Sequence, residues 1–289
     1  MLPSLPQSRL LRWTYRSYIG LFLVYLAAPL AVAATFAFND SLFPALPWKG
    51  FTLGWFFNDR APMIGLFHDA NILRGIGNSL VVAGITTTLS LVVGTTSAFL
   101  FERYDFPLKE LCYMLMLAPL VIPGVILGIS ILVFSSTIAN GIEDRLGLDI
   151  DALRPGLTLV VLGQFSFIAT ISTLVIAARL RKFDRSLEEA ALNLGASPFE
   201  VIRTITLPYL KPALIGAGNV ALLISFENFN TTLMLVGSDA PLTITMYDRM
   251  KEGSTPVLNA VSLFLMIFSG LLGLISIVAQ RDRGTSAAP

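Results

Sequence analysis

The sequence predicts an all-α polytopic membrane protein with six transmembrane helices. Three observations carry this prediction: 54% of the 289 residues are hydrophobic, only 13% are charged, and the mean hydropathy is +0.73. Soluble domains average about 25% charged residues, so this chain has too few to cover a folded globule with a solvated surface. An ordinary cytosolic enzyme and a disordered chain are both excluded.

The net charge and the counts of cysteine and histidine exclude further classes of function. The formal net charge is +1, which provides no basic surface of the kind that binds nucleic acid. A single cysteine excludes a disulfide framework within the chain, and a single histidine excludes a multi-histidine metal site. We therefore expect this chain to bind no cofactor or metal of its own.

Six apolar stretches reach the length of about 20 residues that a membrane-spanning helix needs. They lie near Tyr18–Phe38, Ser79–Phe101, Leu111–Phe134, Leu157–Ala178, Pro212–Val236 and Val257–Val278. The first stretch follows three arginines and contains Ala31-Val32-Ala33, which resembles a signal-peptide cleavage site. Because its apolar run continues to Phe38, an uncleaved span is the favoured alternative.

The distribution of Lys and Arg predicts the orientation of these spans. If the N-terminus is inside, the inner segments hold 13 Lys and Arg and the outer segments hold 7. The chain then divides into a cytoplasmic N-terminus (1–17), a six-span membrane domain (18–278) and a cytoplasmic tail (279–289). We expect a multi-pass protein of the cell inner membrane with both termini in the cytoplasm.

The first outer loop, residues 39–75, is long and rich in aromatic side chains. Its part over 51–67 is typical of an amphipathic segment that lies on the membrane surface. Trp48 and Trp55 suit anchoring at the interface between membrane and water. His68 is then a solvated histidine at this interface.

The third span contains Pro119 and Pro123. Each proline removes a backbone donor and clashes with the preceding turn, so we expect a helix kink. A bent membrane helix needs neighbouring helices or a water-filled cavity to satisfy the carbonyl groups that are set free. The kink either serves packing alone or shapes a translocation path.

The longest inner loop, residues 179–209, predicts two short capped helices. Ser186 and Ser197 are each followed three positions later by a glutamate, which is the pattern of a capping box. Gly195 is placed to end the first helix, and Pro208 is placed to end the second. The apolar faces of these helices would be covered either by a cytoplasmic partner or by the protein's own helix ends.

The same loop resembles the EAA signature of binding-protein-dependent ABC importer permeases. Glu189-Ala190-Ala191 is followed after three residues by Gly195, after nine more by Ile205, and after one more by Leu207-Pro208. This spacing matches the whole signature, and the resemblance extends over nearly the whole chain.

The resemblance implies a type I ABC importer permease fold, in which loop 179–209 is a coupling loop that docks on an ATPase. The implied partners are a homologous permease subunit, two ABC ATPase subunits, an extracytoplasmic solute-binding protein and the lipid bilayer. The chain contains no glycine-rich phosphate loop, so ATP hydrolysis belongs to a separate subunit and this chain is not an enzyme. The residues expected to dock on the ATPase are Glu188, Glu189, Ala190, Ala191, Leu194, Gly195, Ala196 and Pro198.

Within the family, the chain most resembles the second permease subunit of spermidine/putrescine-type importers. Its stretch Ser225-Phe226-Glu227-Asn228-Phe229 is similar to a Ser-Phe-acid-acid-Phe sequence found there, although Asn228 stands where a second acid is common. A polyamine or a related cationic compound is therefore the expected cargo. Opines, amino-acid derivatives, ferric iron and sugars remain alternatives.

Glu227 is the one charged residue within the six predicted spans, and a charge at the bilayer centre costs about 2.5–3.5 kcal/mol on insertion scales. In a continuous helix with about 100° per residue, residues 222–233 form a narrow apolar stripe and a wide polar arc, as a pore-lining helix requires. Glu227 is either an ionised ligand for a cationic substrate or a protonated structural group. The residues expected along the translocation path are Glu227, Asn228, Asn230, Thr231 and Gln164.

Two other classes of membrane protein fit the sequence less well. An embedded enzyme needs paired acids or a metal cluster, and the predicted spans offer one acid and no histidine. An ion-driven secondary transporter predicts an internal inverted repeat and several intramembrane ionisable groups. The chain shows no convincing repeat and offers only Glu227.

Overall fold

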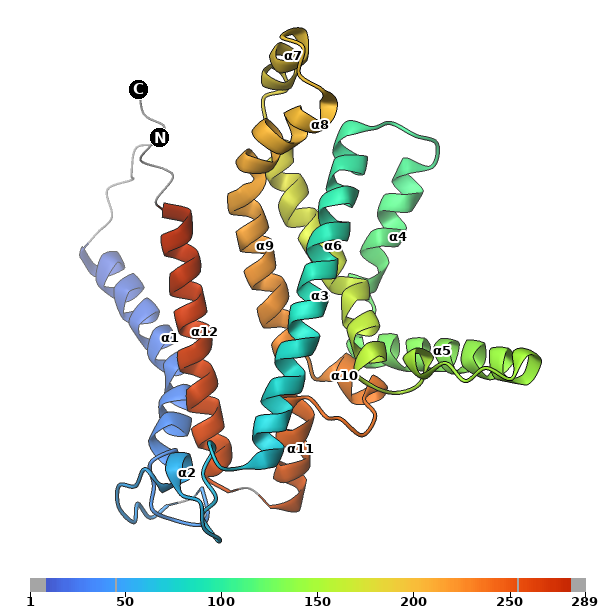
Figure 1. Cartoon of the computed structure of the whole chain (residues 1–289). Coiled ribbons are helices and arrows are strands. Elements are labelled where there is room, and N and C mark those ends of the chain that lie inside the picture. The colour runs from blue at the N-terminus through green and yellow to red at the C-terminus, as the bar shows by residue number, and fades with distance from the viewer. Residues whose placement is uncertain (1–8, 45, 254, 282–289) are drawn as a thin grey trace. The chain divides into compact units, whose positions relative to one another are not determined.

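The computed structural model describes residues 9–44, 46–253 and 255–281, and this part of the chain is built from α-helices (Figure 1). Within these residues the only β-type pairing is a single bridge between Asn39 and Phe51. They form two compact units, one from the residues up to Ala70 together with Arg249–Phe268, and the other from Asn71–Asp248 together with the residues from Ser269. The expected cytoplasmic ends at 1–8 and 282–289 lie outside the described residues.

Six helices of the described chain are long and apolar enough to cross a membrane, which confirms the predicted number. They are Arg9–Phe36, Ala70–Arg103, Gly124–Leu146, Leu157–Leu180, Pro198–Glu227 and Val257–Leu274. Several begin before or end after the apolar stretch that identifies them, because polar residues at the ends of a span also adopt helical backbone.

The first unit contains α1 (Arg9–Phe36), the short α2 (Gly54–Phe57) and the beginning of α12 (Val257–Arg281). The loop that follows α1 folds around Trp55, whose side chain is 1% exposed and whose indole N–H donates to the carbonyl of Asn39 at 2.9 Å. The prediction that Trp55 is an interfacial anchor is therefore wrong. A buried indole needs a hydrogen-bond acceptor, and the folded loop supplies one.

Further contacts hold the same outer loop in a defined shape. The rings of Phe38 and Phe51 stack with their centroids 5.2 Å apart. The carboxylate of Asp69 is buried and forms an ion pair with Arg249 at 2.5 Å, while the neighbouring His68 is exposed. The loop is thus a small folded element rather than one amphipathic segment.

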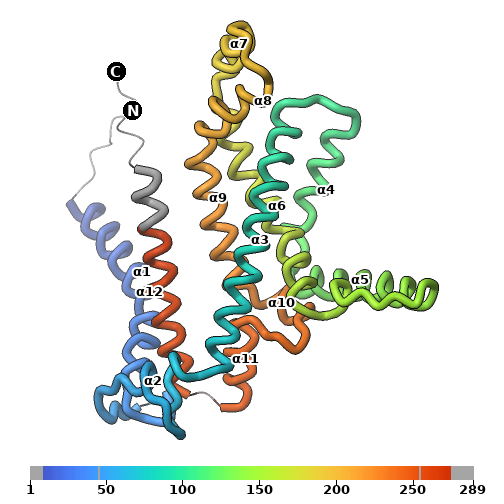
Figure 2. Tube along the Cα trace, in the orientation of Figure 1, coloured from blue at the N-terminus to red at the C-terminus, as the bar shows by residue number. Residues whose placement is uncertain are grey.

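The second unit carries the remaining helices, whose path Figure 2 traces. Its elements are α3 (Ala70–Arg103), α4 (Lys109–Val121), α5 (Gly124–Leu146), a 3-10 turn (Asp151–Leu153), α6 (Leu157–Leu180), α7 (Ser186–Asn193), α8 (Pro198–Val201), a π-helical turn (Ile202–Thr206), α9 (Leu207–Glu227), α10 (Asn230–Leu235) and most of α11 (Leu242–Glu252). Of the candidate spans, α6 has the most buried apolar window, at 56%. It therefore forms the centre of this unit.

Small side chains allow α3 and α6 to approach each other closely. A Cβ atom on Gly94 would lie 2.8 Å from the Cβ of Ser172, so a larger residue would push the helices apart. Near the end of α6 an apolar cluster joins α3, α6 and α9; its buried members are Ala98, Ile176, Ala177, Leu180, Phe183, Leu210 and Ala217.

The expected single kinked span over Leu111–Phe134 is wrong, because two helices occupy this part of the chain. Helix α4 ends at Val121, Ile122 has extended backbone, and α5 begins after Pro123 and continues to Leu146. Figure 1 shows α5 running across the direction of α4 and α6. The residue before a proline disfavours helical backbone, which explains a break at this point; Pro119 is accommodated inside α4.

The fifth predicted span also differs from the expectation, at both ends. Pro208 does not end the second loop helix: α8, the π-helical turn and α9 form one continuous helix from Pro198 to Glu227. A π turn is wider than an α turn, which relieves the clash between the proline ring and the carbonyl four residues earlier. At the other end the helix stops at Glu227, and Asn228 has extended backbone before α10 begins.

Candidate functional site

The first candidate site is the hairpin formed by α7 and α8, residues Ser186–Val201. The capping box expected at Ser186 is wrong, since Ser186 is already helical and its backbone N–H donates to the carboxylate of Asp184 at 3.0 Å. This backbone hydrogen bond lowers the pKa of Asp184 below its ordinary value. A carboxylate two residues earlier has displaced the serine as the cap. The side chain of Glu189 is therefore exposed, and its carboxylate has no hydrogen-bond partner among the described residues.

The corner between the two helices follows the prediction. Gly195 has φ +91°, and its N–H donates to the carbonyl of Leu192 at 3.0 Å, while the N–H of Ala196 donates to Ala191 at 3.1 Å. These two bonds define a Schellman motif, in which the left-handed residue is usually glycine because a side chain is strained there. Gly195 therefore fixes the angle at which α8 leaves α7.

The capping box at the start of α8 is confirmed. The Ser197 hydroxyl accepts the N–H of Glu200 at 3.3 Å, and the Glu200 carboxylate accepts the N–H of Ser197 at 2.8 Å. Pro198 occupies the first helical turn, where its missing donor costs nothing. The two short helices are thus held by local bonds, and the hairpin can behave as a rigid element.

The tip of the hairpin exposes apolar side chains. Leu194 is 89% exposed and Phe199 is 71% exposed. Of the predicted docking residues, Glu188 is set apart, because its side chain is only 20% exposed and faces Arg103. The remaining predicted docking residues are exposed or half-buried at the tip: Glu189, Ala190, Ala191, Leu194, Gly195, Ala196 and Pro198.

The second candidate site is the helix break after α9. The expected helical wheel is wrong here, because residues 222–233 do not form one continuous helix. The side-chain oxygen of Asn228 accepts hydrogen bonds from the backbone N–H and the hydroxyl of Thr232, at 3.2 and 3.1 Å. Asn228 therefore caps α10 and stabilises the break.

Buried polar groups tie this break to α6. The amide of Gln164 is 1% exposed; it donates to the hydroxyl of Thr232 at 2.9 Å and accepts a hydrogen bond from Ser225. Ser225 lies before the break and Thr232 after it, so one glutamine on α6 holds both sides. Buried polar groups that are satisfied in this way rigidify a structure.

The two interrupted spans meet at their breaks. The hydroxyl of Thr231 donates to the carbonyl of Gly124 at 3.3 Å, at the first residue of α5. A Cβ on Gly128 would lie 2.9 Å from the Cβ of Met234, so α5 and α10 are in close contact. In contrast, the side chains of Glu227 and Asn230 are exposed, and the carboxylate of Glu227 forms no hydrogen bond or ion pair with any described residue. Of the other predicted path residues, Asn228 is half-buried, while Thr231 and Gln164 are buried.

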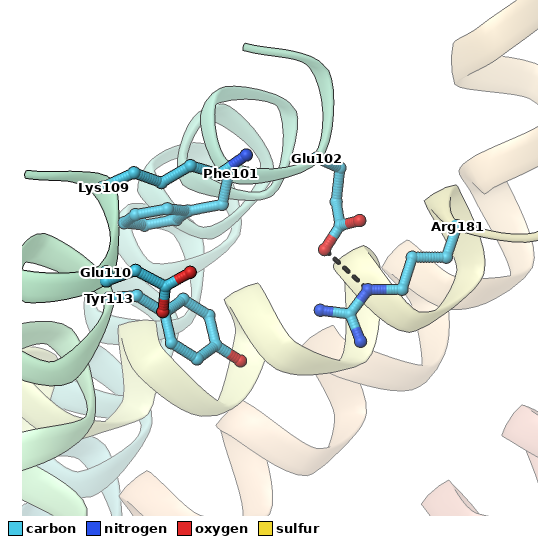
Figure 3. A pocket seen from close by; sticks show the side chains of 6 residues that line it. All are labelled: Phe101, Glu102, Lys109, Glu110, Tyr113 and Arg181. Atoms are coloured by element: carbon cyan, nitrogen blue, oxygen red, sulfur yellow. Dashed lines mark hydrogen bonds and ion pairs between the residues drawn. The ribbon is translucent and has the colours of Figure 1, made fainter. Parts of the chain in front are cut away.

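A cavity of about 260 Å³ lies at the ends of α3, α4 and α6, and Figure 3 shows the side chains that surround it. Within it, Arg181 pairs with Glu102 at 2.7 Å and so joins α6 to α3. Sequence reasoning missed this site because its members lie at the ends of three separate spans: Phe101, Glu102, Lys109, Glu110, Tyr113 and Arg181. Among the described residues, no group of three or more His, Cys, Asp or Glu could hold a metal ion.

Comparison with known proteins identifies the family. The sequence pattern of the binding-protein-dependent transport system inner membrane component matches residues 88–281. The putrescine transport system permease protein PotI of Escherichia coli is 29% identical over 87% of this chain and 85% of its own length. The spermidine/putrescine transport system permease protein PotC of the same organism is 26% identical over 95% of this chain and 96% of its own length.

A solved structure shows the same fold. In the crystal structure of a bacterial alginate ABC transporter in complex with an alginate pentasaccharide-bound periplasmic protein, one chain matches with a TM-score of 0.72 at 19% identity, over 94% of both chains. With the six candidate spans, this confirms an ABC importer permease fold. The chain belongs to the family of binding-protein-dependent transport system inner membrane components, which are permease subunits of ABC importers and leave ATP hydrolysis to a separate subunit.

Proposed function

We propose that this chain is one of two homologous permease subunits of a polyamine importer. In this proposal two ABC ATPase subunits dock on its cytoplasmic side and an extracytoplasmic solute-binding protein delivers the cargo. Both termini lie in the cytoplasm, and the chain binds no cofactor. Two relatives that align over most of this chain carry putrescine or spermidine/putrescine in their names, which supports the cargo class. The excess of Lys and Arg in the inner segments supports the orientation.

The hairpin α7–α8 is the proposed ATPase-docking element. Its capped helices keep the tip rigid, and Leu194 and Phe199 present an apolar surface that a soluble monomer would not leave open. Glu189 adds an exposed carboxylate beside this surface. A rigid apolar tip with a charge at its edge has the composition of a protein–protein contact.

The carboxylate of Glu227 is the observation that carries the proposed cargo. It is exposed at the last residue of α9, where the carbonyl groups of a helix C-terminus add partial negative charge. A carboxylate and a helix C-terminus together favour a cation such as a substrate ammonium group. The attraction between the carboxylate and the ammonium group is stronger inside a protein than in water because the dielectric constant is lower there.

Uptake by the reconstituted importer tests this function. Proteoliposomes that contain the complete importer, with its binding protein outside and ATP inside, should accumulate labelled putrescine or spermidine. They should accumulate neither when ATP is replaced by a non-hydrolysable analogue. Uptake of a sugar or of ferric iron in place of both amines would contradict the proposed cargo. Absence of an ATPase subunit from the purified complex would contradict the proposed assembly.

A further inference from the structure

Glu188 lies in the hairpin but faces the membrane helices. Its Oε1 atom accepts a hydrogen bond from Nη2 of Arg103 at 3.0 Å and another from the hydroxyl of Thr206. Arg103 is the last residue of α3, and Thr206 is the last residue of the π-helical turn that leads into α9. One carboxylate therefore joins α7 to two helices that are far apart in the sequence.

The surroundings of this junction fix the charged groups in place. The side chains of Arg103 and Glu188 are 12% and 20% exposed, and Thr206 is buried. The guanidinium of Arg103 also lies over the ring of Phe183, 5.5 Å from its centroid, and Phe183 belongs to the apolar cluster at the end of α6. An ion pair shielded from water is screened little by salt, and removal of one partner leaves the other charge buried and uncompensated.

The two helices of the hairpin are connected to the spans in different ways. Helix α8 continues through the π-helical turn into α9, so the backbone itself transmits its displacement. Helix α7 is separated from α8 by the corner at Gly195 and follows α6 after the short connection 181–185, but it reaches α3 only through side chains among the described residues. Arg185 donates to the carbonyl of Glu102 at 2.7 Å in an exposed contact, whereas Glu188 makes the partly buried link.

We propose that Glu188 is a positioning residue of the import cycle. It holds α7 against the ends of α3 and α9, so that a displacement of the hairpin moves both helices together. This inference rests on the proposed docking of the hairpin on an ATPase. Without the junction, the displacement would still reach α9 through α8 but would be lost between α7 and α3.

The test measures whether α7 and α3 move as one body. Spin labels attached through Asn193→Cys in α7 and Leu100→Cys in α3, in a Cys112→Ser background, report the distance between these helices in the complete purified importer. Both labelled positions are exposed.

With the native junction we expect one narrow distance distribution, both without nucleotide and after trapping with ATP and vanadate. With Glu188→Gln we expect the trapped distribution to shift or broaden. Stimulation of ATP hydrolysis by the loaded binding protein should fall by about fivefold or more, the lower end of typical coupling between sites.

A matched control separates this role from general loosening. Arg181→Gln breaks the neighbouring ion pair of α3, which leads to α6 and not to α7, and should leave the distance between α3 and α7 unchanged. Glu188→Gln combined with Arg103→Gln should be no worse than either change alone, because both remove one junction. An unaltered distribution in Glu188→Gln, an equal effect of Arg181→Gln, or additive effects in the double variant would each overturn the proposal.

Failure of Glu188→Gln to assemble would leave Thr206→Val as the test of the junction. This substitution keeps the shape of the side chain and removes the hydroxyl that donates to Glu188. An unaltered distance and hydrolysis rate in that variant would then overturn the proposal. A native complex that contains no ATPase would instead contradict the proposed function, and this result can be seen before any variant is measured.

Discussion

The carboxylate of Glu227 is exposed at the end of α9 and forms no ion pair or hydrogen bond within the described residues. If it attracts a cation in transit, Glu227→Gln removes the charge and keeps the size, and Glu227→Asp keeps the charge. We expect Gln to lower the initial rate of putrescine uptake by about tenfold, which corresponds to about 1.4 kcal/mol, and Asp to retain more activity. The measurement is uptake in vesicles, normalised to the amount of assembled complex.

The ranking of the two substitutions separates the alternatives for Glu227. A protonated structural glutamate would be replaced well by glutamine, which also donates and accepts hydrogen bonds, and poorly by the shorter aspartate. Glu252→Gln is the control, because it removes an exposed glutamate at the last residue of a different helix, α11. Higher uptake with Gln than with Asp would rule out the cation ligand and leave the family assignment untouched.

Single residues in the hairpin show what the sequence can and cannot predict at this scale. The roles of Gly195 and Ser197 follow from bonds between residues at most five positions apart, and the structure confirms both. The cap of α7 was predicted wrongly because Asp184 competes for the same N–H as the serine, and spacing alone does not decide between them. The inward orientation of Glu188 depends on Arg103, which is distant in the sequence.

At the scale of elements, the hairpin gives a direct test of docking. Gly195→Asp adds a charge and a strained side chain at the corner, where φ is +91°. We expect the variant to insert into the membrane but to lose ATP-driven uptake and most of the ATPase that copurifies with it. Gly147→Asp is the matched control, since Gly147 also has positive φ, at +65°, and also ends a helix. Normal uptake in the Gly195 variant, or an equal loss in the control, would contradict the docking role.

The number of spans was predictable, whereas their breaks were not. Apolar length is a local property, and it gave six candidate helices. Whether a proline kinks a helix or ends it depends on partners elsewhere: Pro208 is accommodated by a π-helical turn, while Pro123 separates two helices. The break at Asn228 likewise depends on Gln164 of α6, which forms hydrogen bonds with Ser225 before the break and with Thr232 after it.

The contact between the two broken spans can be tested with two glycines of α5. At Gly128 an added Cβ would lie 2.9 Å from the Cβ of Met234 and 3.1 Å from the carbonyl oxygen of Thr231, whereas at Gly141 nothing lies within 4 Å. We expect Gly128→Ala to lower the free energy of unfolding by about 1–3 kcal/mol through overpacking. Gly141→Ala should leave stability unchanged or raise it by up to about 1 kcal/mol through helix propensity.

Thermal unfolding of the purified complex measures both variants under the same conditions. The two substitutions are chemically identical and lie on one helix, so a difference between them reports the packing of α5 against α10. Equal stabilities would mean that the two helices do not press on each other at Gly128. The close approach of α5 and α10 would then contribute nothing to the stability of the helix break between α9 and α10.

For the molecule as a whole, the low content of charged residues and the six candidate spans require that most of the surface faces lipid or other subunits. Helix α1 illustrates this requirement, because its apolar window is 0% buried within the chain. Fold and family follow from these features and from the match to residues 88–281. The side of the membrane on which each loop lies follows only from the distribution of Lys and Arg.

This orientation makes a definite prediction for reporter fusions. A cytoplasmic reporter, such as a fluorescent protein that matures only in the cytoplasm, should be active when it is fused after Gly284. A reporter that works only after export, such as alkaline phosphatase, should be active when it is inserted near Asp149, in the outer segment between α5 and α6. The physical reason is that the inner segments carry 13 Lys and Arg against 7 in the outer ones, and positively charged segments resist translocation. Each reporter exchanged to the other position provides the control and should be inactive there. Activity of one reporter type at both positions would mean that an even number of crossings, and not three, lies between them, which would refute the arrangement of six spans. The reverse pattern would keep six spans and invert the orientation.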